Sequence, residues 1–443
     1  MKKRVFIGVC EIAGYYGQLT RGLREKGYNV TFVGGNWHPF GYKQSKEKQN
    51  WLVAFYEKIR IQRARTSRKK IIKKLFYIGC SEVAKTLMFV WAIMKHDTFI
   101  FGFGTSFFPR NLDLPVLKLL RKRVICNIGH GSDARPPYID GAYLSNNGEH
   151  LGFDSLYRQT KRISSRCLFI GKYADVVVGA PLTSQFLNVK YVNHFQIGLP
   201  FKKEDSQNES SLKSGAVRIL HSPSHPQGKG TPKIRDTINS LKKKGYDIKW
   251  VEVIGQPNSV VLEELSLCDF VVDQLYSDTP MAGFATEAAW FGKPAVVGGY
   301  GWELLKKVIP PGMFPPSQIC HPDHLEEAIE QLIADEKYRT DLGNEAYRFV
   351  REKWSVQQIA ERYIRLIEGD FPKEWYINPD AFIYLLGGCL SESRVKEIVS
   401  KLISVKGVKA LQLSEKPALE RAFLEFALSE EQPIEDDQKI PPR

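Results

Sequence analysis

A glycine-containing loop in the second half of the chain has the residue types that bind a nucleotide. Residues 277–285 form a polar loop between a short apolar strand and a helix that we expect to begin near Thr286. The first turn of a helix has unpaired backbone N–H groups, so the segment around Gly283 and Phe284 can donate to a phosphate. The carboxylate of Glu287 can accept hydrogen bonds from ribose hydroxyls. Ordinary helix capping uses the same residue types and is the structural alternative.

A second candidate loop, residues 129–135, follows an expected strand at 124–128 and contains three side chains suited to ligand binding. His130 can donate to a phosphate or hydroxyl, Asp133 can orient a hydroxyl or an imidazole, and Arg135 can bind an anion through its N–H groups. Loops at strand ends often carry binding residues. A structural turn capped by Asp133 is the alternative.

Two further glycine-containing loops follow expected strands. After the strand at 217–221, Lys229 is flanked by glycines and precedes a helix, where its ammonium can neutralise a diphosphate leaving group. His225 lies in the same loop. The loop after the first strand contains Gly14 and Gly17, which suit the close approach of a ligand and equally a plain tight turn.

Two of these segments are similar to a known enzyme family. The sequence TEAA at 286–289, followed by GKPAVV at 292–297, resembles the EAMAxGxPVV segment of family four glycosyltransferases, a large retaining family with the GT-B fold. The HGSD sequence that contains His130 and Asp133 is similar to a loop of the same family. The resemblance implies that Glu287 binds the nucleotide ribose, and that the histidine lies against the donor sugar and the aspartate near the acceptor.

The same resemblance gives roles to the glycine-containing loops. It implies that Gly14 and Gly17 face the acceptor and the donor phosphates across a cleft between two domains. Family members have a lysine and an arginine near the loop that here contains Lys229. The lysine is present, and His225 or Arg218 is the candidate for the arginine.

One departure from the family pattern affects the donor sugar. Family members carry another glutamate eight residues before Glu287, and this chain has Thr279 there. Asp278, one residue away, is the candidate to contact the hydroxyls of the donor sugar in its place. The resemblance implies retention of configuration, and the replaced glutamate weakens that inference.

The length of 443 residues accommodates two domains and an appendage. The alternation of strands and helices predicts an α/β protein, and the resemblance implies two Rossmann-like domains facing a cleft. We expect an acceptor-side domain at 1–200 with a basic helical insertion at about 45–95, a linker at 201–215, a nucleotide-sugar domain at 216–355, a crossover helix at 356–370, and a helical extension with an acidic tail at 371–443.

Composition bounds the partners and the compartment. The chain has 43% apolar and 25% charged residues, and its formal net charge of +14 favours an anionic partner. Seven scattered cysteines without a CxxC pair support neither a disulfide framework nor a zinc site, and we expect no metal or other cofactor. No apolar run approaches the roughly 20 residues that span a bilayer. We therefore expect a cytoplasmic protein, or one peripheral on the inner face of the plasma membrane.

The insertion combines basic and apolar residues. Residues 51–76 have the composition of a basic amphipathic helix, which predicts contact with an anionic membrane, although a solvated helix face has the same pattern. No nucleic-acid motif accompanies it, so no nucleic acid is expected. Five apolar residues further on keep helical spacing and are interpreted as core contacts: Val83, Leu87, Val90, Trp91 and Met94.

These observations lead to one main hypothesis and two alternatives. The main hypothesis is transfer of a sugar from a nucleotide-diphosphate donor to a glycan or lipid-linked acceptor, in the synthesis of bacterial cell-surface polysaccharide or glycolipid. A different nucleotide-sugar enzyme, such as an epimerase, would act without an acceptor. A non-catalytic protein that binds nucleotide sugar or polyanions is the other alternative, and Thr279 favours it.

Overall fold

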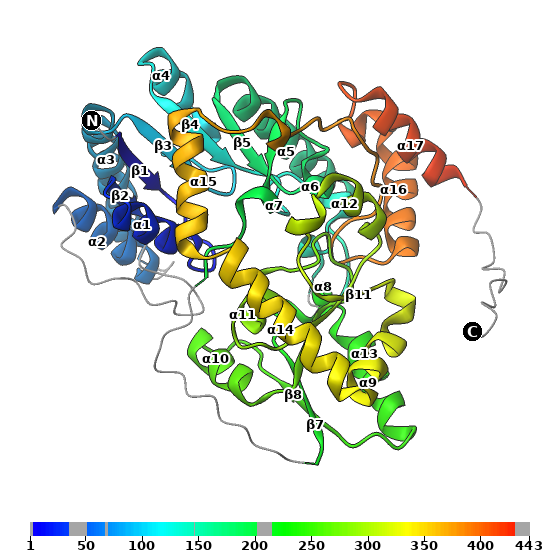
Figure 1. Cartoon of the computed structure of the whole chain (residues 1–443). Helices are drawn as coiled ribbons and strands as arrows, with labels where there is room; N and C mark the ends of the chain where they lie inside the picture. The colour runs from blue at the N-terminus through cyan, green and yellow to red at the C-terminus, as the bar shows by residue number, and fades with distance from the viewer. Residues whose placement is uncertain (1–2, 35–50, 67–69, 146, 202–214, 430–443) are drawn as a thin grey trace.

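The computed structural model describes residues 3–34, 51–66, 70–145, 147–201 and 215–429, which form two α/β domains and a helical C-terminal segment (Figure 1). Each domain is built on one sheet, with strand order β12-β6-β5-β4-β3-β1-β2 in the first and β11-β10-β9-β7-β8 in the second. All strand pairs are parallel except the pair of β12 and β6. The expected GT-B class of fold, with two Rossmann-like domains, is confirmed.

The first sheet is covered by helices on both faces. In β1, Val5 and Ile7 pack on the side of α1, whereas Phe6 packs with Met88 and Phe89 of α3 on the other, because successive side chains point to opposite faces. Its strands are β1 (Arg4–Gly8), β2 (Asn29–Val33), β3 (Thr98–Phe101), β4 (Arg123–Asn127), β5 (Val176–Gly179), β6 (Tyr191–Asn193) and β12 (Tyr376–Ile377). Its helices are α1 (Tyr15–Glu25), α2 (Trp51–Arg65), α3 (Ile71–Lys95), α4 (Leu114–Leu119), α5 (Phe153–Tyr173), α6 (Pro181–Ser184) and α7 (His194–Ile197).

The second sheet has the same layered construction. Ile219 and Val272 pack towards α9 and α13, whereas Leu220 and Val271 pack towards α10 and α11. The strands are β7 (Val217–His221), β8 (Ile248–Glu252), β9 (Phe270–Gln274), β10 (Ala295–Gly298) and β11 (Gln318–Cys320). The helices are α8 (Pro226–Lys229), α9 (Thr231–Lys243), α10 (Asn258–Leu267), α11 (Gly283–Trp290), α12 (Trp302–Val308), α13 (Leu325–Ala334) and α14 (Glu336–Lys353).

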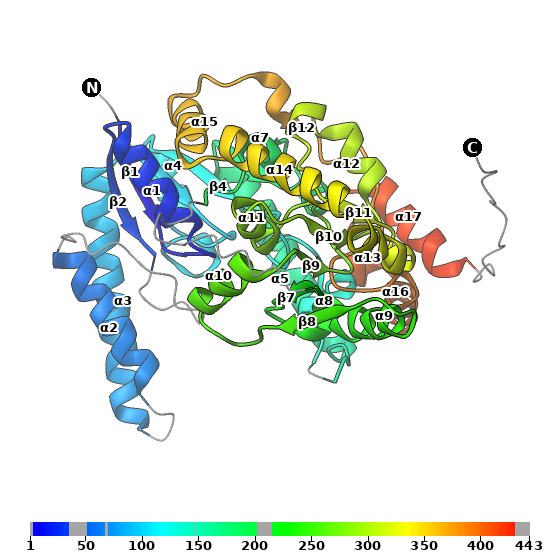
Figure 2. The same ribbon diagram turned by 60° about the horizontal axis from the view of Figure 1, so that its bottom comes forward.

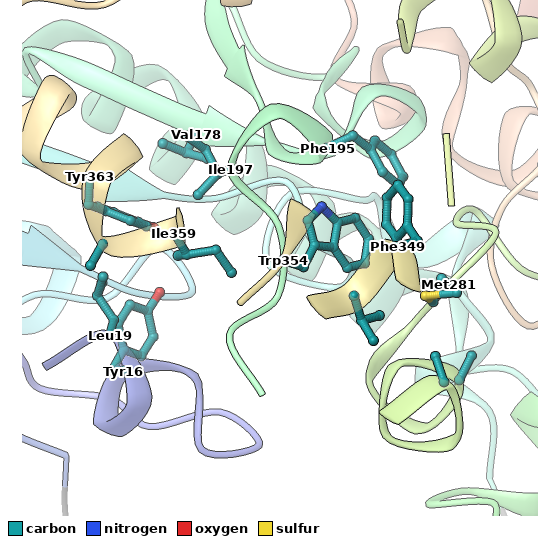
Figure 3. Close-up of a cluster of buried hydrophobic side chains, with 14 of the residues drawn as sticks. Tyr16, Leu19, Val178, Phe195, Ile197, Met281, Phe349, Trp354, Ile359 and Tyr363 are labelled. Atoms are coloured by element: carbon teal, nitrogen blue, oxygen red, sulfur yellow. The ribbon is translucent and has the colours of Figure 1, made fainter. Parts of the chain in front are cut away.

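The two domains share one buried core around Trp354 (Figure 3). The indole of Trp354 contacts Phe349, which belongs to the second domain, and Phe195, which belongs to the first. Gly198 adopts a φ of 93°, and a Cβ there would lie 2.3 Å from the indole, so only glycine fits. After Trp354, helix α15 (Val356–Glu368) returns to the first domain and packs against α1.

The C-terminal segment is an integral part of the first domain. Strand β12 pairs antiparallel with β6 at the edge of the first sheet. Helices α16 (Glu392–Lys406) and α17 (Pro417–Leu428) bury Val399 and Phe423 against Tyr138 and Leu156 of the first domain. The expected linker and the acidic end of the tail lie almost wholly outside the residues that the structure describes.

The prediction of core contacts in α3 is wrong for most of its residues. Val83, Leu87, Val90 and Met94 are exposed, whereas the face that contains Ala84 and Met88 is buried. The helix carries apolar residues on two opposite faces, so two stripes both fit the helical period and the spacing cannot distinguish them. The helix is also long and apolar enough to cross a membrane by length and composition, contrary to the sequence expectation.

Near the end of the first domain, strand β6 is followed directly by a short helix. Strand β6 ends at Asn193, whose side chain accepts a hydrogen bond from the Phe195 N–H at 3.1 Å. That cap starts the short helix α7.

Candidate functional site

The second sheet places two of the predicted loops on either side of its topological switch point. The chain passes from β7 to β8 on one side and then returns to β9 on the other side of β7. In open parallel sheets the crevice at such a reversal, at the carboxyl ends of the strands, is where ligands bind. The loop after β7 contains Lys229, and the loop after β9 leads into α11.

Lys229 is held at this crevice by the end of β9. Its ammonium donates a hydrogen bond to Oε1 of Gln274, and its carbonyl accepts from the Leu275 N–H at 3.1 Å. The neighbouring carboxyl group of Asp273 is buried, which raises its pKa, and the charge of Lys229 opposes that shift. The lysine therefore carries its positive charge at the point where β7 and β9 end.

His225 shapes the loop that carries Lys229. Its Nδ1 accepts a hydrogen bond from the Gly228 N–H at 3.0 Å and caps α8. Arg218, the other candidate for the family arginine, lies near the start of β7 and is paired with Glu264, so it does not belong to this crevice.

The first turn of α11 is open. Within the described chain no side chain caps this helix, and a Cβ at Gly283 would meet no atom within 4 Å. The Thr286 hydroxyl donates to the Ala282 carbonyl at 2.8 Å and is thus engaged by its own helix. The N–H groups of Gly283 and Phe284 are therefore placed to donate to an anion.

Glu287 lies behind this turn and is buried. Its two carboxylate oxygens accept from the Nδ2 of Asn258 at 3.1 and 3.3 Å. Asn258 starts α10, in the loop after β8. The segments that follow β8 and β9 are thus joined by this contact. Asn258 was not predicted as a site residue, because a polar residue at the start of a helix is common and does not by itself indicate binding.

In the first domain, Asp133 organises its own loop. Its carboxylate oxygens accept from the Gly129 N–H at 3.0 Å and the His130 N–H at 2.9 Å. Burial raises the pKa of Asp133 to about 6, and the charge of Arg166 opposes the shift. Both oxygens serve the backbone, so the role near an acceptor stays a prediction.

His130 is exposed to solvent. Its side chain is solvent-accessible, yet the surrounding protein desolvates the ring and lowers its pKa to about 4. The ring meets His194 edge to face, with centroids 4.6 Å apart. His194 is buried, which also lowers its pKa. Both imidazoles are therefore neutral at pH 7, and His130 can exchange hydrogen bonds with a hydroxyl or phosphate without a charge of its own.

Arg135 and Asp278 come from different domains and form a buried ion pair with each other. Arg135 also lies 3.5 Å from Asp140, so one guanidinium faces two carboxylates. Burial raises the pKa of Asp278 and the charge of Arg135 opposes that shift. From the sequence, we expected both residues to contact the donor. In the structure each is the partner of the other, and their roles in donor binding stay predictions.

A strap from the C-terminal segment, residues 384–390, lies over this ion pair. A Cβ at Gly388 would be 2.4 Å from Nη1 of Arg135, and the Gly388 carbonyl accepts from the Gly141 N–H at 3.0 Å. One residue later, the Cys389 N–H donates to the Tyr276 carbonyl of the second domain at 2.8 Å. The strap therefore ties both domains together. The adjacent glycines 387 and 388 were its only signal in the sequence.

In the first loop of the chain, the side chain of Glu11 folds back onto the N–H groups of its own loop and of the helix that follows. Helix α1 follows Gly14, which has a φ of 78°. The carboxylate of Glu11 accepts from the N–H groups of Ile12 at 2.8 Å, Tyr16 at 3.1 Å and Gly17 at 2.8 Å. A donor phosphate at this loop would compete with Glu11 for these N–H groups. Burial raises the pKa of Glu11 to about 7.

Among the residues described, no group of three or more His, Cys, Asp or Glu side chains is placed to hold a metal ion. All seven cysteines are free.

Comparison with known proteins finds similarity at the level of structure. No family model and no curated protein sequence matches the chain. The catalytic domain of starch synthase IV from Arabidopsis thaliana, bound to ADP and acarbose, is similar over 84% of this chain and 99% of its own, with 10% identity and a TM-score of 0.48. Sucrose-phosphate synthase from Thermosynechococcus elongatus is similar over 83% and 99%, with 14% identity and a TM-score of 0.47.

A third solved structure, Anabaena HepE in complex with UDP and glucose, is similar over 83% of this chain and 100% of its own, with 11% identity and a TM-score of 0.44. Proteins of one fold carry out many activities, so the function of this chain has to be argued from its own residues.

Proposed function

We propose that the protein is a glycosyltransferase that moves a sugar from a nucleotide-diphosphate donor to an acceptor. One observation supports the proposal: Lys229 follows β7, the open first turn of α11 and Glu287 follow β9, and these two neighbouring strands end at the switch point of the second sheet. A cation and unpaired N–H groups suit a diphosphate, and a buried carboxylate beside them suits the hydroxyls of a ribose. Together these groups match the parts of a nucleoside diphosphate.

The proposed chemistry needs charge stabilisation at the leaving group. When the bond between the sugar and the diphosphate breaks, the electron pair stays on the phosphate oxygen, and Lys229 with the N–H groups of Gly283 and Phe284 faces that charge. The acceptor oxygen forms the new bond to the sugar, and its proton passes to the departing diphosphate or to solvent water. We assign no general base. We propose that the reaction needs no metal or other cofactor and, from the family resemblance, that it retains configuration.

We propose a glycan or lipid-linked acceptor and a place on the inner face of the plasma membrane, in the synthesis of bacterial cell-surface polysaccharide or glycolipid. The basic hairpin of α2 and α3 supports a membrane contact, since a cationic surface attracts anionic lipids. A neutral and solvent-exposed His130 supports a contact with the donor sugar.

The first test is thermal unfolding of the full chain with a panel of nucleoside diphosphates and nucleotide sugars. A ligand at about 100 times its Kd stabilises the folded state by about 2.7 kcal/mol. We expect a shift with one base, lost in Glu287→Ala. Glu303→Ala is the matched control, because Glu303 is likewise a glutamate of a helix that follows a strand of the same sheet, but is exposed.

The outcomes separate the hypotheses. No shift with any nucleotide would overturn the proposed donor site. A shift followed by a change of the donor sugar without any acceptor would indicate an epimerase. A shift without any turnover, with donor and a panel of acceptors, would indicate a binding protein.

A further inference from the structure

The α2–α3 hairpin presents an apolar stripe to solvent. Figure 2 shows the hairpin extending away from the body of the molecule, on the side opposite α16 and α17. The exposed apolar residues of α3 that form what we call the outer stripe are Ile72, Phe76, Val83, Leu87, Val90 and Met94. Their exposed fractions run from 44% to 86%.

The outer stripe lies opposite the face that holds α3 in the fold. At 100° per residue, its six members fall within an arc of about 60°. The residues of α3 that face α2 and the sheet, among them Ala84, Met88 and Ala92, are buried with Val53 and Tyr56 of α2. The helix is therefore already anchored through one face, and its outward face is apolar as well.

An apolar stripe of this length is unusual for a surface in contact only with water. From Ile72 to Met94 the helix rises about 33 Å at 1.5 Å per residue. Solvent-facing helix surfaces ordinarily carry charged and polar residues, and large exposed apolar patches mark interaction sites. The stripe therefore calls for a partner that buries apolar side chains along one side of a helix.

The charges beside the stripe identify the partner. The described part of the hairpin around its turn carries basic residues at Arg63, Arg65, Lys70, Lys73 and Lys74. This basic end is the one farthest from the body of the molecule (Figure 2).

The hairpin has few acidic residues to balance these. In its described part, Glu57 is buried, and Glu82 pairs with Lys85 at 2.5 Å and with Arg63 at 3.9 Å. The surface is thus apolar with a cationic border. A second copy of the chain would bring the same positive charge against itself, whereas an anionic leaflet supplies the opposite charge.

We propose that α3 lies flat on an anionic lipid leaflet, with the outer stripe among the acyl chains near the headgroups and the basic end of the hairpin on the lipid phosphates. The helix lies along the membrane, because a spanning helix would have to leave the core that holds Ala84 and Met88. The proposal moves the membrane contact from residues 51–76, where the sequence placed it, to the whole outer side of α3. It rests on the proposed function only in supposing a lipid-held acceptor.

The test is sedimentation of the full chain with vesicles of phosphatidylglycerol, and with vesicles of phosphatidylcholine for comparison. We expect at least tenfold more bound protein on phosphatidylglycerol at low salt, and at least a tenfold loss of binding in Phe76→Glu/Leu87→Glu. The matched control is Val405→Glu/Leu428→Glu, which places two glutamates at equally exposed apolar positions of α16 and α17. We expect this control to bind like the wild type.

Three results would overturn the proposal. The wild type could fail to sediment with phosphatidylglycerol, or Phe76→Glu/Leu87→Glu could sediment as well as the wild type. The third is a dimer in solution that dissociates in Phe76→Glu/Leu87→Glu, while neither protein binds vesicles, because the stripe would then cover a second copy.

A far-UV circular dichroism melt of each variant shows whether it is folded. Each variant should fold, because all the substituted positions are exposed. No nucleotide is needed in this experiment. Its failure is therefore separate from a failure of the nucleotide panel.

Discussion

Replacing Arg135 by methionine tests whether the two domains are held together by a buried charge. The guanidinium lies between Asp278 of the second domain and Asp140 of the first, and all three side chains are at most 9% exposed. Methionine keeps much of the volume and removes the charge. Two buried carboxylates then lose their counter-ion, and within the described residues Oδ1 of Asp278 and Oδ2 of Asp140 already lack a hydrogen-bond partner.

The expected loss is about 3–5 kcal/mol of the free energy of unfolding at pH 7.5, the usual cost of breaking a buried ion pair from one side. Burial raises the pKa of both aspartates even in the presence of Arg135. A raised pKa means that the folded state binds the proton more tightly than the unfolded state, so the folded state gains stability as the pH falls. In Arg135→Met the opposing charge of the guanidinium is gone, so the pKa of both aspartates should rise further, and the loss at pH 5.5 should be smaller than at pH 7.5.

Urea unfolding measures this loss, with far-UV circular dichroism and tryptophan fluorescence followed together, because coincident transitions justify a single free energy. Arg235→Met is the matched control, since Arg235 pairs with Glu252 at the surface and should lose only about 0–1 kcal/mol. Arg135→Met/Asp278→Leu should be less destabilised than Arg135→Met alone, because one stranded carboxylate is gone. An effect no larger than that of the control, a loss independent of pH, or additive losses in the double variant would each refute the reasoning.

Two further predictions concern the core and the first loop. Trp354→Ala should lose about 3–5 kcal/mol in the same urea experiment, because the indole fills the core shared by both domains. Trp354→Phe should lose less, and equal losses would contradict a packing role. Glu11 has a pKa raised to about 7 by burial, so its contribution to stability should rise as the pH falls from 8 to 5, by at most about 1.4 kcal/mol per pH unit. Glu11→Gln should remove that slope, and an unchanged pH profile would show that Glu11 is not the titrating group.

The sequence predicted the elements of the sheets well, because fully buried parallel strands are continuous apolar runs. The strand at 217–221 is found with the bounds expected, and the crossover helix expected at 356–370 is found at 356–368. The loops at the strand ends were also located correctly, because each loop begins where a predicted strand ends. The roles of individual residues within those loops followed from residue type and from the family resemblance, and they stay predictions.

Most of the features that could not be predicted from the sequence depend on contacts between residues that are far apart in the chain. Arg135 and Asp278 are 143 positions apart. No local sequence pattern shows that Arg135, which is suited to bind the anionic group of a ligand, is instead paired with a carboxylate of its own chain. Glu11 was passed over because an acidic residue before a helix gives no sign that it folds back onto the N–H groups of that helix. The outward face of α3 could not be chosen from the sequence, because both faces are apolar. Strand β12 has two residues, which is too short for any periodic signal.

The position of β12 has a consequence for biosynthesis. The first domain begins at the N-terminus, yet the edge of its sheet is completed by Tyr376 and Ile377, and part of its surface is buried only by α16 and α17. Domains generally fold as units while the ribosome extends the chain at about 5–20 residues per second. Here the last strand of the first domain is synthesised only after the entire second domain. During that interval the edge of β6 and the apolar surface around Tyr138 are open to the ribosome exit region and to chaperones.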